Sequence, residues 1–221
     1  MRLEKRNELH NDQFSLIPLT EKDVFRSWEI LCFNCGNDDL NEFFQIDSYA
    51  HFKELLATTY YFQPIEATEK NMFLPVALIS LLNDRIEITK EERKGEKKGF
   101  GKDLQKSIPY PKRNYSSFPA VKIGRLGVSI KYQRNDIGTC LLNMIKDLFL
   151  KNNRTGCRYI TVDAYNTEKT INFYLKNNFL PLWDEDIDDP YSRILYFDLK
   201  RHQVHSSSPD ISPKATSSPG A

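Results

Sequence analysis

The stretch from residue 121 to residue 150 constrains the fold most strongly. Residues 121–130 are rich in β-branched and apolar side chains, and residues 137–150 carry apolar side chains at helical spacing, with a polar turn between the two segments. The first N–H groups of such a helix have no partner within the helix, and the helix dipole adds partial positive charge there. The sequence therefore predicts a strand, an anion-binding turn and a helix in direct succession.

The remaining segments alternate in the same way. Strand-like segments are predicted at 14–19, 58–62, 72–82, 158–164 and 191–199, and helices at 20–28, 37–56 and 167–177. Pro75 predicts a sheet edge or a bulge within its segment, because proline cannot donate to a sheet. Alternating strands and helices indicate a mixed α/β sheet.

Length and charge indicate one domain with two polar additions. A chain of 221 residues with 40% hydrophobic residues can form one core, so residues 1–203 are predicted to be a single domain and the Ser/Pro-rich residues 204–221 a disordered tail. Residues 83–118 contain more basic than acidic side chains and little apolar surface, which predicts a mobile insertion, with a short helix near its start as an option. The formal net charge of +1 provides no global attraction to nucleic acid, so an RNA partner would need a local patch.

The sequence argues against a membrane protein and against a zinc or redox protein. No apolar run reaches the roughly 20 residues of a spanning helix, so we expect a soluble, cytoplasmic protein without a membrane partner. Cys32 and Cys35 form a C-x-x-C, which is half of a zinc site or a redox pair in other proteins, but Cys140 and Cys157 stand far away. We expect thiols in a reducing compartment and no bound metal.

The turn before the 137–150 helix resembles the pyrophosphate loop of the GNAT acetyltransferases. That pattern is Gln or Arg, two variable residues, Gly, one variable residue, then Gly or Ala, and here Gln133 holds the first position and Gly138 the last. Asp136 stands where the family has Gly, and its side chain and charge are expected to hinder phosphate, with Arg134 and the helix end offsetting part of this. The resemblance implies acetyl-CoA as co-substrate, held by Leu126, Gly127, Val128, Gln133, Arg134, Asn135, Asp136, Ile137, Gly138, Thr139 and Asn166.

A second match lies at 170–179, which is similar to the family's closing helix with its Phe-Tyr pair. Asn178 replaces the family's Gly, and Asn tolerates the left-handed conformation of a helix C-terminus. By resemblance, Tyr174 is the general acid that reprotonates the CoA thiolate, while Phe173 is expected to be the core member of the pair. The alternative for Tyr174 is a packing role.

The resemblance also implies how the sheet holds the cofactor. The family's sheet is mixed and mostly antiparallel, is flanked by helices, and is split between the two strands that hold acetyl-CoA. The first of these strands carries a bulge and pairs its exposed backbone with the pantetheine arm. Here Leu126, Gly127 and Val128 would provide that backbone, Gly127 would ease the approach, and the Val128 N–H would be the oxyanion donor. Asn166 would bond the pantetheine, with a turn-forming role as an equal alternative.

Residues 33–44 and 119–126 narrow the resemblance to a branch that includes toxins of toxin–antitoxin pairs. Direct attack of an amine on acetyl-CoA is expected, and since no His or Glu stands out as a base, an α-amine or aminoacyl acceptor is favoured over a lysine amine. Three functions remain open: a small-molecule or protein N-acetyltransferase, a toxin that acetylates aminoacyl-tRNA and binds an antitoxin, and a catalytically weak acyl-CoA-binding protein. The toxin hypothesis predicts a basic patch of Lys122, Arg125, Lys131 and the insertion, and a homodimer is an option under each.

Overall fold

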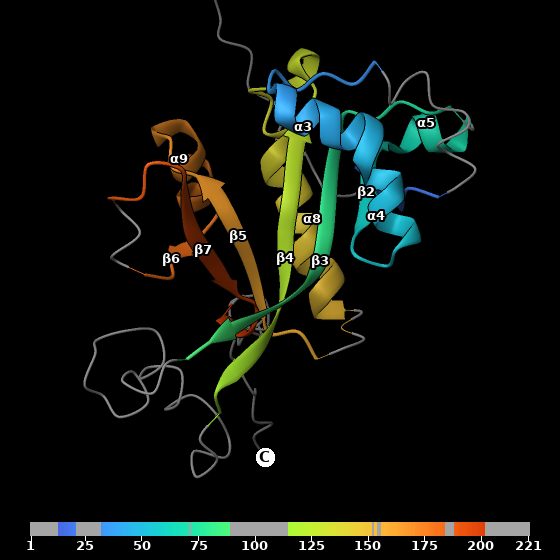
Figure 1. The fold of residues 1–221 in the computed structure, drawn as a ribbon. Coiled ribbons are helices and arrows are strands. Elements are labelled where there is room, and N and C mark those ends of the chain that lie inside the picture. The colour runs from blue at the N-terminus through green and yellow to red at the C-terminus, as the bar shows by residue number, and fades with distance from the viewer. Residues whose placement is uncertain are drawn as a thin grey trace, which may run out of the picture.

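The computed structural model describes residues 13–20, 32–70, 72–88, 115–151, 153, 156–183 and 188–201. They form one seven-stranded sheet in the order β1-β2-β3-β4-β5-β7-β6, in which β4 and β5 are parallel and the other pairs are antiparallel (Figure 1). The strands are β1 Phe14–Pro18, β2 Thr58–Pro64, β3 Ala77–Glu87, β4 Ser117–Val128, β5 Tyr159–Tyr165, β6 Leu180–Pro181 and β7 Ser192–Asp198. The mixed, mostly antiparallel sheet predicted from the sequence is confirmed.

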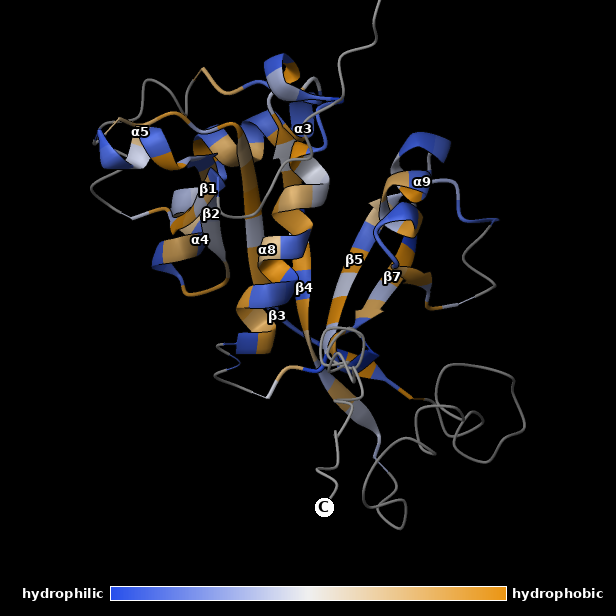
Figure 2. Cartoon of the chain, turned by 180° about the vertical axis from the view of Figure 1, so that it is seen from behind, coloured by the Kyte–Doolittle hydropathy of each residue, from blue (hydrophilic) through white to orange (hydrophobic). Residues whose placement is uncertain are grey.

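Helices cover both faces of this sheet. On one face α3 (Asp38–Glu42), the π-helical turn η2 (Phe43–Asp47) and α4 (Ser48–Lys53) follow one another, while α8 (Ile137–Lys151) covers the other face (Figures 1 and 2). The shorter elements are α5 (Ile65–Glu69), the 3-10 turn η3 (Ile130–Tyr132) and α9 (Glu168–Lys176). No helix among these described residues is long and apolar enough to cross a membrane.

The first described helical segment begins as predicted but ends early. The Asn37 side chain accepts a hydrogen bond from the Leu40 N–H at 3.0 Å and caps α3. Helical structure was predicted to reach residue 56, but α4 ends at Lys53, and Leu55 adopts φ +57° and is 90% exposed. The apolar stripe of this segment therefore stops before Leu55. The predicted helix 20–28 lies outside the described residues, apart from Thr20.

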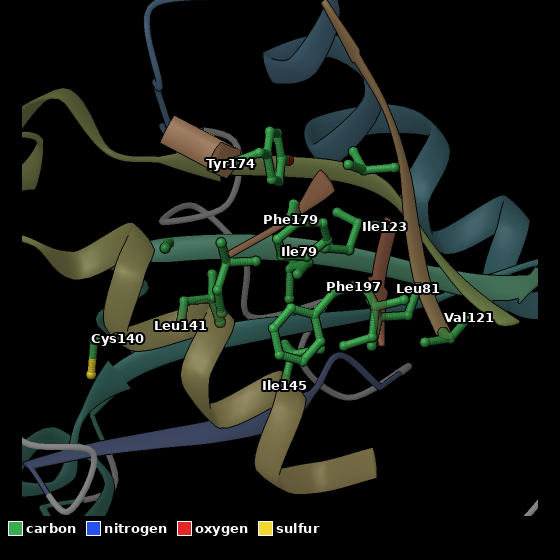
Figure 3. Close-up of a cluster of buried hydrophobic side chains, with 14 of the residues drawn as sticks. Ile79, Leu81, Val121, Ile123, Cys140, Leu141, Ile145, Tyr174, Phe179 and Phe197 are labelled. Carbon is green, nitrogen blue, oxygen red and sulfur yellow. The ribbon is translucent and has the colours of Figure 1, made fainter. Parts of the chain in front are cut away.

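The alternation of side chains along the strands separates two cores. On the α8 face, Leu141 and Ile145 of the helix point toward Ile79, Phe179 and Phe197 (Figure 3). On the α3 face, a smaller cluster includes Phe33, Phe43, Phe44, Tyr61 and Leu78. Both faces are thus buried, which explains the nearly continuous apolar run in the first part of β3.

Both ends of the segment predicted to be an insertion are strand. Residues 83–87 continue β3, and β4 already begins at Ser117, so the expected loop character of both ends of 83–118 is wrong. Polar residues in this part alternate with buried ones: Arg85 pairs with Glu87 at 2.5 Å on the exposed side, and Ile86 packs into a third core cluster with Phe118. Pro75 precedes β3 and does not interrupt it. Residues 89–114 and the predicted tail at 204–221 lie outside the described residues.

The sheet is bulged and split at β4. The partners of β4 in β3 shift between Ser80, opposite Arg125, and Leu81, opposite Ile123, so Gly124 is the extra residue of a β-bulge. Strand β5 pairs with β4 only from Ala120 to Ile123, and beyond that point the two strands diverge (Figure 1). The bulge and the split implied by the family resemblance are confirmed.

Candidate active site

One pocket occupies the split. It has a volume of about 300 Å³ and lies between the edge of β4, the turn before α8 and the first half of α9. All predicted site residues except Asn135 and Asn166 line it. The full lining is Cys35, Leu40, Leu126, Gly127, Val128, Tyr132, Gln133, Arg134, Asp136, Ile137, Gly138, Thr139, Lys169, Thr170, Phe173 and Tyr174.

The N-terminus of α8 opens into this pocket. The helical hydrogen bonds begin with the Cys140 N–H, which donates to the Asp136 carbonyl at 2.9 Å. The N–H groups of Ile137, Gly138 and Thr139 precede that bond and have no carbonyl partner within the helix. Three donors and the positive end of a fifteen-residue helix thus line one wall, which suits an anion such as a pyrophosphate.

The turn before α8 has a backbone that favours glycine. Arg134 adopts φ +62° and Asp136 adopts φ +55°, and this left-handed conformation costs a residue with a Cβ about 1 kcal/mol. This explains physically why the family has glycine where Asp136 stands. Asn135 is exposed and donates its side-chain amide to the Tyr132 and Gln133 carbonyls, so it supports the turn and does not face the pocket.

Gln133 joins the turn to both neighbouring elements. Its Nε2 donates to the Cys35 carbonyl at 2.7 Å and to the Val128 carbonyl at 3.0 Å. The donors of this side chain are therefore used within the protein. Gln133 shapes the pocket and leaves phosphate binding to backbone groups.

The edge of β4 offers backbone groups to the pocket. The Ser129 N–H donates at 2.9 Å to the carbonyl of Val76, the residue before β3, and in an antiparallel pair such bonds occur at every second residue. The N–H groups of Leu126 and Val128 therefore point away from β3, toward the split. Gly127 also admits the packing of the α3 face, because a Cβ there would lie 3.1–3.2 Å from Phe44 and Cys35. Its role in the approach of a ligand stays a prediction.

Tyr174 lies at the floor of the pocket. Its side chain is 5% exposed and packs edge-on against Phe173 and Phe179, with ring centroids 5.0 and 5.3 Å away. Burial raises the pKa of its phenol far above the ordinary value, so the O–H stays protonated at neutral pH. The expectation that Phe173 is the core member of the pair is wrong: Tyr174 is the more buried residue, and Phe173 is half-buried with its ring 3.0 Å from a Cβ placed on Gly138.

The ends of α9 fix Tyr174 in this position. Thr167 caps the helix by accepting from the Thr170 N–H, and the Phe179 N–H returns to the Tyr174 carbonyl at 3.1 Å. Asn178 adopts φ +63°, which confirms the left-handed C-terminus predicted from its place in the sequence.

Asn166 lies outside the pocket. Its Nδ2 donates to the Asp189 carbonyl, and its N–H donates to the Tyr191 carbonyl at 3.0 Å. These contacts hold the connection before β7 against the end of β5. These contacts fit the turn-forming alternative, and a contact of Asn166 with pantetheine stays a prediction.

Several lining residues were not predicted. Lys169, Thr170 and Phe173 come from the first turns of α9, and Thr170, Phe173 and Tyr174 share one helix face by their spacing of three and four residues. That spacing was a usable signal. Cys35 and Leu40 reach the pocket from the α3 face, and no local pattern indicates this contact.

The cysteines are free, with Cys32 exposed and the other three buried. The Cys35 thiol contacts the Asn41 Oδ1 at 3.2 Å, and burial raises its pKa. Among the residues that the structure describes, no group of three or more His, Cys, Asp and Glu side chains could hold a metal ion.

The described residues of the predicted basic patch are partly neutralised by acidic neighbours. Lys122 forms an ion pair with Asp163, and the Arg125 Nε lies 3.8 Å from the Asp39 carboxylate. Lys131 is exposed in η3. The basic residues at 90–113 lie outside the described residues.

Comparisons with known proteins identify structural neighbours only. No family model matches the sequence, and no curated protein matches it. A Tyr-to-Phe mutant of KacT superposes with a TM-score of 0.64 at 22% identity, covering 87% of this chain and 99% of that one. AtaTR bound with acetyl-CoA gives 0.61 at 17% identity, covering 89% and 99%. AtaT complexed with acetyl-methionyl-tRNAfMet gives 0.62 at 21%, covering 88% and 99%.

These neighbours are GNAT acetyltransferases of toxin–antitoxin pairs. The likeness extends over most of each chain and includes a mixed sheet flanked by helices. The chain therefore has the fold of the GNAT toxins AtaT and KacT, in agreement with the resemblance of residues 124–139 and 170–179 to that family.

Proposed function

We propose that this protein is an N-acetyltransferase that moves an acetyl group from acetyl-CoA to a primary amine by direct attack. The observation that carries the proposal is the composition of one pocket. The N-terminus of α8, the unpaired edge of β4 and the Tyr174 side chain all line it. An anion site, an edge that can accept an extended ligand and a protonated phenol are the three features that thioester aminolysis with CoA needs.

The residues present fit acetyl-CoA as a substrate. The N–H groups of Ile137, Gly138 and Thr139 would hold the pyrophosphate, with Arg134 and Lys169 adding positive charge at the rim. The open backbone of Leu126 would pair with the pantetheine arm. The Val128 carbonyl already accepts from Gln133, and the Val128 N–H is the donor available to the thioester oxygen as it gains negative charge.

The sulfur that departs from the thioester then needs one proton. The amine nitrogen forms a bond to the carbonyl carbon, the carbon–sulfur bond breaks, and the departing thiolate takes the phenolic proton of Tyr174. The nitrogen that has attacked loses its extra proton to water, and the Tyr174 phenolate takes up one proton from water, so the phenol is restored at the end of the cycle. An α-amine with an ordinary pKa of 7.7–8.0 is substantially neutral before it attacks. Tyr174 suits the donor role because burial keeps it protonated.

For the acceptor, we propose the amino group of an aminoacyl-tRNA as the second and narrower function. Support comes from the structural neighbours. AtaT is seen with acetyl-methionyl-tRNAfMet, and a mutant AtaT is seen with the C-terminus of the antitoxin AtaR. KacTA is seen with DNA. The same proposal includes a cytoplasmic location, an antitoxin partner and a homodimer. The catalytically weak acyl-CoA-binding protein is the alternative, and Asp136 in the strained turn is the residue that favours it.

Calorimetric titration with acetyl-CoA tests the binding half of the proposal. Transfer is then measured with three acceptors: methionyl-tRNA, L-methioninamide and a lysine-containing peptide. We expect saturable binding and turnover of at least one α-amine. Tyr174→Phe should lower kcat by 10²- to 10⁴-fold, the usual range for a positioned acid, with the Kd of acetyl-CoA unchanged. Binding without turnover of any acceptor would support the binding-only alternative.

A further inference from the structure

A polar cluster lies on the α3 face of the split, on the side away from Tyr174. The Tyr165 hydroxyl at the end of β5 donates to the Asp39 Oδ2 at 2.8 Å. The Arg125 Nε of β4 lies 3.8 Å from the same oxygen, and its guanidinium lies 5.2 Å from the centre of the Phe43 ring. Three elements that are distant in sequence thus meet at one carboxylate.

The alternation of the strands places this cluster opposite Tyr174. In β5, Ile160, Val162 and Ala164 belong to the core beneath α8, so Tyr165 points to the other face. The same holds for Arg125 in β4, which packs on Phe43 of the α3 face. Tyr174 is a member of the α8-face core. Asp39 and Tyr174 therefore lie on opposite sides of the gap between β4 and β5.

The pocket reaches from one side to the other. Cys35 and Leu40 line it from the α3 face, and Phe173 and Tyr174 line it from α9. Leu40 is the immediate chain neighbour of Asp39. The α3-face end of the pocket therefore lies at the helix turn that carries Asp39.

The state of the carboxylate suits a ligand with N–H donors. The Asp39 side chain is 61% exposed, and its contacts with Tyr165 and Arg125 are both made by Oδ2. Arg125 lies too far away for a hydrogen bond, and its Nε is buried without one. Asp39 is thus held in place by Tyr165 while Oδ1 is available to accept from an amine, whether neutral or protonated.

We propose that Asp39 binds the acceptor's primary amine at the α3-face entrance to the split, and that Tyr165 positions the carboxylate. The inference rests on the proposed acetyltransferase function and adds Asp39 as a residue that selects amines on the side of the split opposite to the cofactor. Asp39 also gives the acceptor an acidic partner, which the sequence did not indicate.

The test compares Asp39→Asn with Asp38→Asn in the full-length protein. Asn at position 39 can still accept the Tyr165 hydrogen bond but loses the charge, and Asp38 is an exposed neighbour on the same helix, so its variant removes an equal charge outside the cluster. Initial rates are measured at saturating acetyl-CoA with methionyl-tRNA, L-methioninamide and a lysine peptide. Calorimetry gives the Kd of acetyl-CoA, and thermal unfolding reports stability.

We expect Asp39→Asn to raise KM for the best acceptor at least tenfold, since a hydrogen bond to a charged group contributes about 1.5–3 kcal/mol. The kcat, the Kd of acetyl-CoA and the melting temperature should stay close to the wild-type values. Tyr165→Phe should raise KM by a smaller factor, and Asp38→Asn should leave it within twofold.

Two results would overturn the inference while leaving the acetyltransferase proposal intact. One is an Asp39→Asn enzyme with wild-type KM. The other is a KM change that is matched by Asp38→Asn or accompanied by an equal loss of acetyl-CoA affinity, which would indicate a structural or general charge effect. A wild-type protein that acetylates none of the three acceptors would instead count against the proposed function itself, and with it against this inference.

Discussion

Lys146 connects the stability of the protein to pH through a buried amine. Its side chain is 2% exposed in α8, its Nζ donates to the Asn177 carbonyl at 2.8 Å, and the same nitrogen lies 4.2 Å from the centre of the Phe197 ring. Asn177 is the C-cap of α9, the helix that carries Tyr174. Lys146 thereby links the two helices that form the candidate site.

Burial lowers the pKa of Lys146 from 10.5 to about 8. Between these two values the unfolded chain holds a proton that the folded chain has released, so the free energy of unfolding rises with pH. The slope is about 1.4 kcal/mol per pH unit above the folded pKa, and it falls toward zero below that pKa, where both states are protonated. From pH 7 to pH 9 this group should therefore add about 1 kcal/mol of stability.

The assay is thermal unfolding at pH 7, 8 and 9 for the wild type, Lys146→Met and Lys151→Met. A change of 1 kcal/mol moves Tm by roughly 2–4 °C in a protein of this size. We expect the wild type and Lys151→Met, whose lysine is exposed on the same helix, to gain this increment relative to Lys146→Met. The window ends at pH 9 because burial raises the pKa of the Cys157 thiol to about 11, and this shift opposes the Lys146 contribution at higher pH. Identical pH dependence in Lys146→Met and the wild type would show that Lys146 does not cause the increase.

Substitutions at three further positions test the local geometry. Asp136→Gly relieves φ +55° and removes a negative charge from the anion site, so it should tighten acetyl-CoA binding several-fold in calorimetry; weaker binding would contradict the expected repulsion. Gly127→Val should lower the unfolding free energy by about 1–3 kcal/mol in urea titrations, because its Cβ would lie 3.1–3.2 Å from Phe44 and Cys35, whereas an unchanged midpoint would show that this face can yield. Asn178→Gly should be nearly neutral and Asn178→Ala destabilising by about 1 kcal/mol, and equal effects would argue against the left-handed C-terminus.

The predictable part of the fold is the part governed by local pattern. Strand β5, helix α8 and helix α9 follow from periodicity and capping residues, and the predicted segments 158–164, 137–150 and 167–177 agree with the observed elements within one or two residues. The bulge and the split came from family resemblance, since no local rule places an extra residue at Gly124.

Tertiary contacts account for the features that were missed. The second half of β3 contains Asp84, Arg85 and Glu87, a composition typical of a loop. It is strand because residues 83–87 pair with residues 117–121 of β4, and Asp84 also accepts from the Thr161 hydroxyl of β5. The relative burial of Phe173 and Tyr174 has a similar origin. Both are aromatic and adjacent, and Tyr174 is the more buried because it packs against Phe179 in the core beneath α8.

Within the candidate site, the backbone donors could be predicted and the acceptor side could not. The pyrophosphate loop is one continuous segment, so its spacing is visible in the sequence. The Asp39 carboxylate meets Tyr165 across 126 positions of the chain, and that meeting depends on the divergence of β4 and β5.

The central claim, that the split in the sheet is an acetyl-CoA site, is tested most directly by calorimetric titration of the wild-type protein with acetyl-CoA at pH 7.5. The account predicts saturable binding with a micromolar Kd, and a weaker Kd for a variant in which Gly138→Val forces Phe173 into the pocket. Absence of heat up to millimolar acetyl-CoA, for the wild type and for Asp136→Gly alike, would contradict it.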